Sequence, residues 1–246
     1  MTLTPISVDI DAYPAEFRRI LSGAQIYDSS CSPEAKVVYI DRDCGYFLKS
    51  AAKGVLLREN AMTQYFNEKG LSAKVIEYIS REQDWLLTEK IPGNDCVAAK
   101  YLERPERLCD TIAELLVALH EMDFDKCPVP NHIEKYAAMA RRYAVSAADH
   151  SAIDTAERIF DADTLLHGDY CLPNIILKDW NFSGFIDLDQ SGVGDRHVDI
   201  FWGAWTLQYN LKTDKYRQRF LDAYGRQKID LERLEIVYSI ERIIGL

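Results

Sequence analysis

The stretch "LLHGDYCLPNIIL", residues 165–177, places one histidine, one aspartate and one asparagine between two apolar runs. A second stretch, "FSGFIDLD" at residues 182–189, follows after a short polar break. Short apolar runs bounded by turn-forming residues predict the two strands of one hairpin. Asp169 and Asn174 then lie on the loop that enters the first strand, and Asp187 closes the second. The pattern therefore predicts three oxygen-bearing side chains at one end of a two-stranded ribbon.

This set of side chains suits phosphoryl transfer from a nucleotide. Such a reaction needs an acid that orients the attacking hydroxyl group, and hard oxygen ligands that hold Mg²⁺ against the phosphates. It also needs a cation, and Lys49, which ends the run "GYFLK", can form an ion pair with Glu59 in the next element. Each feature alone is common in proteins. Their order along the chain favours a kinase.

The sequence pattern of the first third of the chain predicts a small antiparallel sheet. Short β-rich runs with turn residues between them predict strands, and one longer run has apolar residues at helical spacing and stops at Gly70. We therefore expect a small α+β lobe over residues 1–90, which binds the nucleotide. The predicted elements are strands at 35–41 and 45–51, a helix at 55–70, and strands at 73–80 and 84–91.

The pattern becomes mainly helical after residue 90. We expect a larger C-terminal lobe over residues 91–246, with the catalytic loop and the acceptor site. The predicted fold class is α+β, with two lobes. The predicted helices lie at 104–122, 133–147 and 151–160 and again from about residue 197, with two short strands at 174–178 and 182–189.

Composition and charge exclude several classes of protein. The 246 residues carry a formal net charge of −10, which argues against a nucleic-acid-binding protein and suits a cationic ligand. The six cysteines form no CxxC pair, so no zinc site is expected. No apolar run approaches the roughly 18 residues of a membrane span, and the first residues lack the pattern of a signal peptide. We expect a cytoplasmic protein with free thiols and no membrane partner.

Two motifs together resemble a known family. "HGDYCLPNIIL" followed by "GFIDLDQSGVGDRHVDI" is similar to the aminoglycoside phosphotransferases, and within them to the 3′-phosphotransferase branch. The resemblance runs from "CSPEAKVVYI" to the last helices and is most specific over residues 167–199. It implies a protein-kinase-like fold, ATP and Mg²⁺ as cofactors, and an antibiotic-resistance kinase that phosphorylates a hydroxyl group of an aminoglycoside or a similar amino sugar.

The resemblance also implies roles for residues of the two motifs. Asp169 would be the catalytic acid of the HGDxxxxN motif. Asn174 and Asp187 would be the metal ligands. His167 and Asp199 would hold the catalytic loop through hydrogen bonds.

Nucleotide-binding roles follow in the same way for the first lobe. Lys49 would contact the α- and β-phosphates, with Glu59 as its ion-pair partner. Ser32 would lie over the phosphates in place of a glycine-rich loop. Glu89 and Ile91 would offer backbone groups to the adenine edge.

The acceptor site is the part in which the chain departs most from the family pattern. The segment over residues 123–163, which helps to form the antibiotic pocket in the family, is short, and Gln190 stands where a basic residue is common. Ammonium groups of the acceptor need carboxylates. The candidates are Asp161 and Asp163 before the motif, and Glu235 and Glu241 in the last helix.

Several alternatives stay open at the level of sequence. The short 123–163 segment favours a metabolite kinase of the same fold, acting on choline, homoserine or another small alcohol. A nucleotide-binding protein without transfer activity is a second alternative, although the presence of Lys49, Asp169, Asn174 and Asp187 together argues against it. The sequence does not distinguish ATP from GTP as the donor, or a monomer from a dimer.

Overall fold

A computed structural model of the chain divides into two compact units. The sequence pattern places Ser183–Asp189 with the helices, whereas the structure groups this segment with the first sheet. The nucleotide role of residues 1–90 and the acceptor role of residues 91–246 stay predictions. The structure describes residues 4–31, 33 and 35–245; unit 1 runs to Pro92 and includes Ser183–Asp189, and unit 2 contains Gly93–Phe182 and the chain from Gln190 onward.

Unit 1 is built on a six-stranded antiparallel sheet with the strand order β1-β2-β3-β4-β6-β5. Asp43 and Gly45 have positive φ angles of 52° and 85° in the turn between β3 and β4, a backbone shape typical of tight hairpins. The predicted hairpin and the two strands after the helix are confirmed, while β1 and β2 were not predicted. The strands are β1 (Thr4–Ile6), β2 (Gln25–Asp28), β3 (Ala35–Asp41), β4 (Tyr46–Ala52), β5 (Val75–Ser80) and β6 (Gln83–Glu89).

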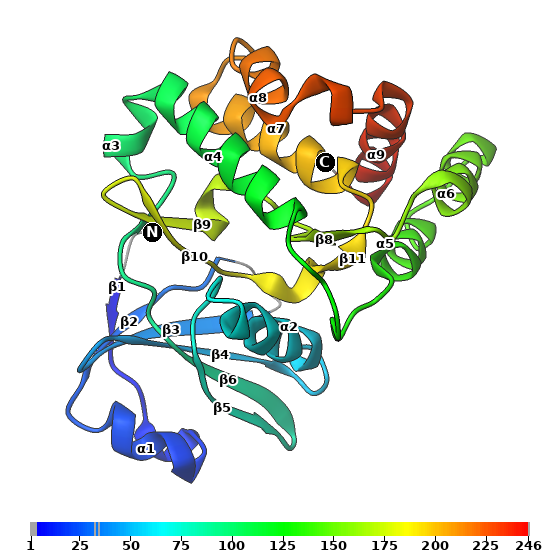
Figure 1. The fold of residues 1–246 in the computed structure, drawn as a ribbon. Coiled ribbons are helices and arrows are strands. Elements are labelled where there is room, and N and C mark those ends of the chain that lie inside the picture. Colours follow the sequence, from blue (N-terminus) through cyan, green and yellow to red (C-terminus); the bar gives the residue numbers. More distant parts are fainter. Residues whose placement is uncertain (1–3, 32, 34, 246) are drawn as a thin grey trace. The chain divides into compact units, whose positions relative to one another are not determined.

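Two helices cover opposite faces of this sheet (Figure 1). They are α1 (Ala15–Leu21), which follows the 3-10 turn η1 (Ile10–Ala12), and α2 (Leu57–Glu68). Successive residues of a strand point to opposite faces. Leu87 therefore packs with Phe17 of α1, while Leu86 packs with Leu56 at the start of α2. Lys49 lies opposite Leu86 in the register of β4 and β6, so its side chain is on the α2 face.

The end of strand β10 (Asn181–Phe185) joins unit 1 through a few specific contacts. The backbone N–H of Phe185 donates to the carbonyl oxygen of Leu71 at 2.7 Å, and the hydroxyl of Ser72 donates to the carbonyl of Phe185 at 3.0 Å. The strand predicted over 182–189 was therefore too long. The strand ends at Phe185, Asp187 beyond it has a left-handed φ angle of 57°, and the short 3-10 turn η3 (Leu188–Gln190) follows.

Unit 2 is mainly helical, with α4 packed against α7 and α8, and with α5, α6 and α7 packed against α9 (Figure 1). The helix predicted at 104–122 is confirmed. The next prediction was wrong in detail: one helix ends at Arg141 and another begins after Ser146, whose hydroxyl caps it in a capping box with Asp149. The helices are α3 (Ala99–Leu102), α4 (Pro105–His120), α5 (His132–Arg141), α6 (Ala147–Ile159), α7 (His197–Leu211), α8 (Arg217–Tyr224) and α9 (Leu231–Ile244), with η4 (Arg226–Lys228) before α9.

Short strand pairs position the HGD loop within unit 2. Strands β8 and β11 are antiparallel and lie at its start, and η2 with β9 lies at its end. Among the helices that the structure describes, none has the length and apolar character to cross a membrane. The elements are β7 (Asn94–Asp95), β8 (Thr164–Leu166), η2 (Leu172–Asn174), β9 (Ile175–Lys178) and β11 (Gly192–Gly194), with strand order β10-β9-β7 in the second sheet.

Candidate active site

The loop after β8 can form only with glycine at its second position. Gly168 has φ 83°, and a Cβ atom there would lie 2.0 Å from the carbonyl oxygen of Gln190. Any side chain would therefore force the loop away from that backbone. This close approach explains the glycine of the HGD motif.

Asp199 of α7 fixes the backbone of the same loop through hydrogen bonds. One carboxylate oxygen accepts the N–H of His167 at 2.8 Å, and the other accepts the N–H of Gly168 at 2.7 Å. Burial alone would raise the pKa of Asp199, but these bonds and the one from His120 Nε2, at 3.2 Å, outweigh it and hold the pKa below its ordinary value. The buried carboxylate is thus charged and fully used in holding the loop.

Asp169 and Asn174 are brought together by this loop. The amide Nδ2 of Asn174 donates to the Asp169 carboxylate at 2.8 Å and to the Asp169 carbonyl at 3.0 Å. The amide oxygen of Asn174 takes part in neither bond. The half-buried Asp169 carboxylate therefore has a fixed direction, and the loop also offers an amide oxygen.

Two further bonds tie the loop to helices of unit 2. The hydroxyl of the fully buried Tyr170 donates to the carbonyl of Ile112 in α4 at 2.7 Å, and the N–H of Leu172 donates to Thr206 Oγ1 in α7 at 3.1 Å. These contacts could not be read from sequence spacing, because the partners lie more than thirty residues away.

Lys49 of unit 1 lies between two carboxylates. Its ammonium group is 2.8 Å from Glu59 and 3.1 Å from Asp187. Burial alone would lower the pKa of Lys49, but the charges of Asp187 and Glu59 outweigh it and raise the pKa above its ordinary value. The ion pair expected between Lys49 and Glu59 is present, and Asp187 joins it.

Asp187 differs from Glu59 in its exposure. Glu59 is a buried residue of α2, whereas the Asp187 side chain is 50% exposed. Asp187 also has a left-handed backbone conformation, which aspartate tolerates better than most residues. Glu59 is therefore a permanent partner of the lysine. Asp187 has room to take another partner as well.

The structure does not test the roles of the other three residues that were predicted to bind the nucleotide. Glu89 ends β6, and its N–H donates to the carbonyl of Lys74 at 3.0 Å. Ile91 follows outside any strand, and its side chain lies beside Gly184, where a Cβ atom would come 2.7 Å from it. Ser32 lies outside the described residues. The adenine and phosphate roles of these three residues stay predictions.

Glu241 of α9 is the acidic candidate that the fold brings to the catalytic loop. It is buried, and its carboxylate accepts the hydroxyl of Tyr136 at 2.7 Å and the indole N–H of Trp202. Burial, and next the charge of Asp169, raise the pKa of Glu241 to about 7, although both hydrogen bonds lower it. Glu241 thus lies within the electrostatic reach of Asp169.

The other acidic candidates have partners or lie in solvent. The carboxylate of Asp161 is 2.6 Å from Arg233, and Asp163 lies 4.0 Å from Arg196 and accepts the hydroxyl of Thr164. Glu235 is exposed on α9. Roles for these three acids in acceptor binding stay predictions.

A group of side chains that the motif analysis missed supports the start of α9. Buried Asp195 binds His197 and, at 2.6 Å, Arg233, while His197 Nε2 accepts the N–H of Asp230 at 2.8 Å. The hydrogen bonds and charge of His197, together with the backbone N–H of Asp161, hold the pKa of Asp195 at about 2 against the opposing effect of burial. The signal was available in "GDRHVD", where two acids flank two bases at the start of a helix.

Magnesium would find a suitable but incomplete set of ligands in this chain. Among the described residues, no three His, Cys, Asp or Glu side chains converge to hold a metal ion. Mg²⁺ often uses one or two protein oxygens and takes the rest from water and substrate phosphates. The exposed carboxylate of Asp187 and the amide oxygen of Asn174 are of that type, so their chemistry fits Mg²⁺.

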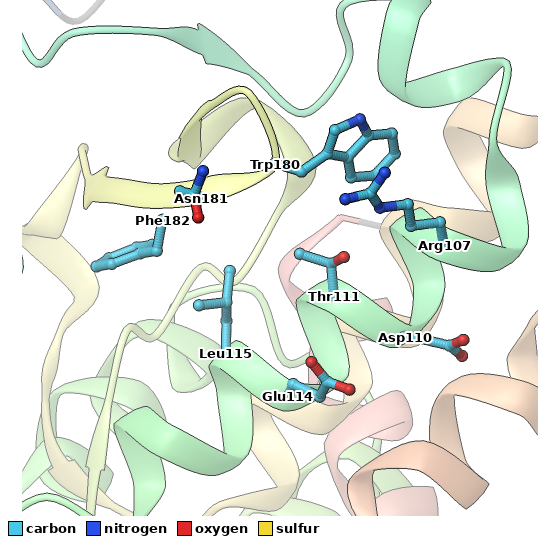
Figure 2. A pocket seen from close by; sticks show the side chains of 8 residues that line it. All are labelled: Arg107, Asp110, Thr111, Glu114, Leu115, Trp180, Asn181 and Phe182. Carbon is cyan, nitrogen blue, oxygen red and sulfur yellow. The ribbon is translucent and has the colours of Figure 1, made fainter.

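A surface cavity in unit 2 contains none of the predicted site residues. It has a volume of about 460 Å³ and lies between the start of α4 and the turn after β9 (Figure 2). The guanidinium of Arg107 is 4.2 Å from the centre of the Trp180 ring, and Asp110 on its wall is paired with Arg219 at 2.6 Å. These charges are already matched by protein partners.

Solved structures resemble the whole described architecture. The crystal structure of aminoglycoside-3′-phosphotransferase of type VIII matches with a TM-score of 0.73 and 23% identity, over 95% of each chain. Aminoglycoside phosphotransferase APH(3″)-Id from Streptomyces rimosus, in complex with ADP and streptomycin, matches with a TM-score of 0.66 and 19% identity, over 86% of this chain and 91% of that one. The predicted kinase-like α+β fold is confirmed.

Sequence comparison identifies the family directly. A probable aminoglycoside 3′-phosphotransferase of Lactococcus lactis subsp. lactis (strain IL1403) is 48% identical over 256 aligned positions, which cover 97% of this chain and 98% of the relative. The model of the phosphotransferase enzyme family matches residues 31–237, and the resemblance drawn from the HGD and FIDLD motifs is confirmed. The chain therefore belongs to the phosphotransferase enzyme family, and it is an enzyme that transfers a phosphoryl group to an alcohol.

Proposed function

We propose that the protein transfers the γ-phosphoryl group of ATP to a hydroxyl group of an aminoglycoside. The observation that carries this proposal is the Asp169 carboxylate, directed by Asn174 on a loop that Asp199 clamps. It is found in a chain nearly half identical to a probable aminoglycoside 3′-phosphotransferase. A fixed acid of this kind can orient an acceptor hydroxyl and accept its proton.

Lys49 supplies the positive charge that the phosphates require. Its two carboxylate neighbours keep it protonated at any physiological pH and fix its position on β4. Phosphoryl transfer depends mainly on positioning and on neutralising negative charge, so a fixed lysine contributes directly. The ADP complex of the related Streptomyces rimosus enzyme supports a nucleotide as the donor.

Asp187 and Asn174 are the proposed ligands of Mg²⁺, which supplies further neutralisation of phosphate charge when it is bound. Asp187 would then exchange part of its contact with Lys49 for the metal. A cytoplasmic location is part of the proposal, since ATP is abundant there and the six cysteines are free thiols.

The acceptor is proposed to be a polycation. An aminoglycoside carries several ammonium groups at neutral pH, and the chain has 39 acidic and 29 basic side chains apart from histidine. Glu241 is the acid whose position best supports this choice, since Asp169 influences it electrostatically. Asp161, Asp163 and Glu235 are proposed as further acids of the acceptor site, and Asp161 should contribute least because it is paired with Arg233.

The direct test is a coupled assay of ADP release over a panel of acceptors. Kanamycin, neomycin and streptomycin would be compared with choline and homoserine, with ATP and GTP as donors, and the product identified by mass. We expect turnover with at least one aminoglycoside, and turnover lower by about a hundred-fold or more in the Asp169→Asn variant. Turnover with choline or homoserine but with no aminoglycoside would replace the proposal with the metabolite-kinase alternative.

A further inference from the structure

Two buried aspartates at the start of α7 hold different segments of unit 2. Asp199 accepts two backbone N–H groups of the HGD loop. Asp195, four positions earlier, accepts the backbone N–H of Asp161 at 3.2 Å and binds the guanidinium of Arg233 in α9 at 2.6 Å. Both carboxylates are almost fully buried, so a change of partners would be costly for either. The catalytic loop and the start of α9 are therefore held by the same short stretch of chain.

His197 adds a hydrogen bond between the start of α7 and the start of α9. Its ring is buried, Nε2 lies 2.8 Å from the backbone N of Asp230, and Nδ1 lies 2.5 Å from the Asp195 carboxylate. A backbone N–H can only donate, so Nε2 accepts this bond and carries no proton. The proton of the ring is then on Nδ1, which donates to Asp195. One tautomer of His197 thus joins both segments, and we call Asp195, His197, Asp230 and Arg233 the α9 anchor.

The α9 anchor holds the first turn of the helix that carries Glu241. At 1.5 Å per residue, Glu241 lies about 16 Å beyond Asp230 along the helix axis. α9 packs beside α5, α6 and α7 (Figure 1), and its buried apolar side chains are Leu234, Val237 and Ile240. Apolar burial has no preferred direction, whereas a hydrogen bond does. The bonds of the α9 anchor therefore fix the helix along its axis more sharply than its apolar side chains do.

The position of Glu241 matters because Asp169 lies within its electrostatic reach. The charge of Asp169 is one of the causes that raise the pKa of Glu241. An acceptor whose hydroxyl group is oriented by Asp169 can place an ammonium group at Glu241 only if the two acids keep a fixed separation. Asp199 sets one end of this separation through the loop, and the α9 anchor sets the other end through the helix. The start of α7 is common to both.

We propose that His197 is a positioning residue for the acceptor. By accepting the N–H of Asp230, it holds α9 at the place along its axis where Glu241 and Asp169 bind one molecule together. This proposal rests on the proposed function and adds a residue that acts through Glu241. The bonds of the His197 ring go to Asp195 and Asp230, so its loss should weaken acceptor binding and leave ATP binding unchanged.

The first test uses two variants that each keep one of the two ring bonds. His197→Asn places an amide near the position of Nδ1, where it can donate to Asp195, but it leaves the N–H of Asp230 without an acceptor. His197→Gln places an amide oxygen near the position of Nε2, where it can accept that N–H. We expect the KM for kanamycin to rise about three- to ten-fold in His197→Asn, the range of one hydrogen bond, and less than about two-fold in His197→Gln.

Two further quantities separate positioning from a general loss of activity. The kcat and the KM for ATP should change by less than about two-fold in both His197 variants, because neither bond reaches the nucleotide or the catalytic acid. His150→Asn is the control for the substitution itself, since His150 is exposed on α6. It should match the wild type in all three quantities.

The second test removes the same bond from the side of α9. Asp230→Pro has no backbone N–H, and proline is tolerated here because Asp230 has φ −91° and Ile229 before it is extended, with φ −109° and ψ 118°. Asp230→Ala is the matched control, because it also lacks the capping carboxylate but keeps the N–H. We expect the KM for kanamycin to be about three- to ten-fold higher in Asp230→Pro than in Asp230→Ala. This pair gives the answer if urea unfolding shows that His197→Asn does not fold.

Hydrogen exchange of the α9 amides measures the anchor without any turnover. Amides of residues 231–244 should exchange faster in His197→Asn and Asp230→Pro than in His197→Gln and Asp230→Ala, because the start of the helix opens more often. Faster exchange in a protein that turns over no aminoglycoside would leave the anchor standing and overturn the proposed function. Turnover with the same KM for kanamycin within each pair would leave the function standing and overturn the positioning role. Unchanged exchange in both pairs would overturn that role as well.

Discussion

The loop at residues 167–174 and the segment at residues 183–189 each carry one predicted site aspartate, but the fold holds them differently. The loop is fixed by a glycine that admits no side chain, by Asp199 and by bonds to α4 and α7. The segment is tied mainly at Phe185, and Asp187 beyond it is half exposed. An acid that orients a hydroxyl needs one fixed direction, whereas a carboxylate that exchanges a lysine for a metal needs room to move.

The largest effect should come from the fixed acid. Asp169→Asn keeps the bond to Asn174 possible but removes the base, so kcat should fall about 10²- to 10⁴-fold, as is usual for loss of a general base. ATP affinity should change little, because the acid acts on the acceptor. ADP-release kinetics and calorimetric titration of Mg·ATP measure the two quantities. A variant with near-normal kcat would remove Asp169 from this role.

Among these residues, Asp199, which holds the backbone of the loop, should matter most for stability. Asp199→Asn leaves one of its N–H partners facing an amide NH₂ group, and the free energy of unfolding should fall by about 3 kcal/mol, as for other broken buried charge networks. Urea unfolding checks this. Asp154→Asn is the control, since Asp154 is 69% exposed and its pair with Arg141 should contribute less than about 1 kcal/mol. Equal losses in the two variants would mean that Asp199 does not hold the loop.

Lys49, the lysine that contacts Asp187 of the more loosely held segment, should show its role through coupling with Glu59. Lys49→Ala should lower kcat/KM for ATP by about ten- to hundred-fold, the equivalent of a charge-assisted hydrogen bond, and Glu59→Gln should lower it less. The double variant should resemble Lys49→Ala alone, because Glu59 acts through the lysine. Losses that add in the double variant would contradict a shared function of the pair.

Local sequence rules predicted the parts of this site that depend on neighbours in the chain. The β3–β4 hairpin places Lys49 by strand alternation, and the helix that follows supplies Glu59. Asp169 and Asn174 meet because they are only five positions apart on one loop. In each case short spacing and regular geometry were sufficient.

Contacts between distant segments could not be predicted in this way. Tyr136 and Trp202 reach Glu241 only because α5, α7 and α9 pack together, and Asp195 binds Arg233 across thirty-eight residues. The break of the strand before Asp187 was missed too, since a left-handed φ angle at an aspartate leaves no mark in hydrophobic spacing.

A smaller, pH-dependent effect should distinguish Glu241 from the other acids. Burial and the charge of Asp169 raise the pKa of Glu241 to about 7 from an ordinary value near 4.5. Between these two pH values the unfolded chain releases a proton that the folded chain keeps, so this group lowers stability as the pH rises. The full displacement corresponds to about 3 kcal/mol.

Glu241→Gln should remove this dependence, because an amide keeps an oxygen for Tyr136 and Trp202 and does not ionise. Urea unfolding from pH 4.5 to 7.5 would compare the two proteins. We expect the wild type to lose stability relative to Glu241→Gln as the pH rises through this window. Parallel stability curves would show that Glu241 is ionised throughout, as an exposed acid would be.

The smallest effect on stability and on acceptor binding is expected at Asp161. Unlike the buried Glu241, it is exposed and paired with an arginine. Its side chain is 59% exposed and shares Arg233 with the buried Asp195, so the arginine keeps one carboxylate when the other is removed. Asp161→Asn should therefore cost at most about 1 kcal/mol of stability, and Arg233 should limit the change in the KM for kanamycin to less than about two-fold. Kinetics at low and high salt provide the check, because an exposed charge that bound an ammonium group would be screened over about 8–10 Å. A KM that rises several-fold in Asp161→Asn at low salt only would show that this carboxylate leaves the arginine to bind the acceptor.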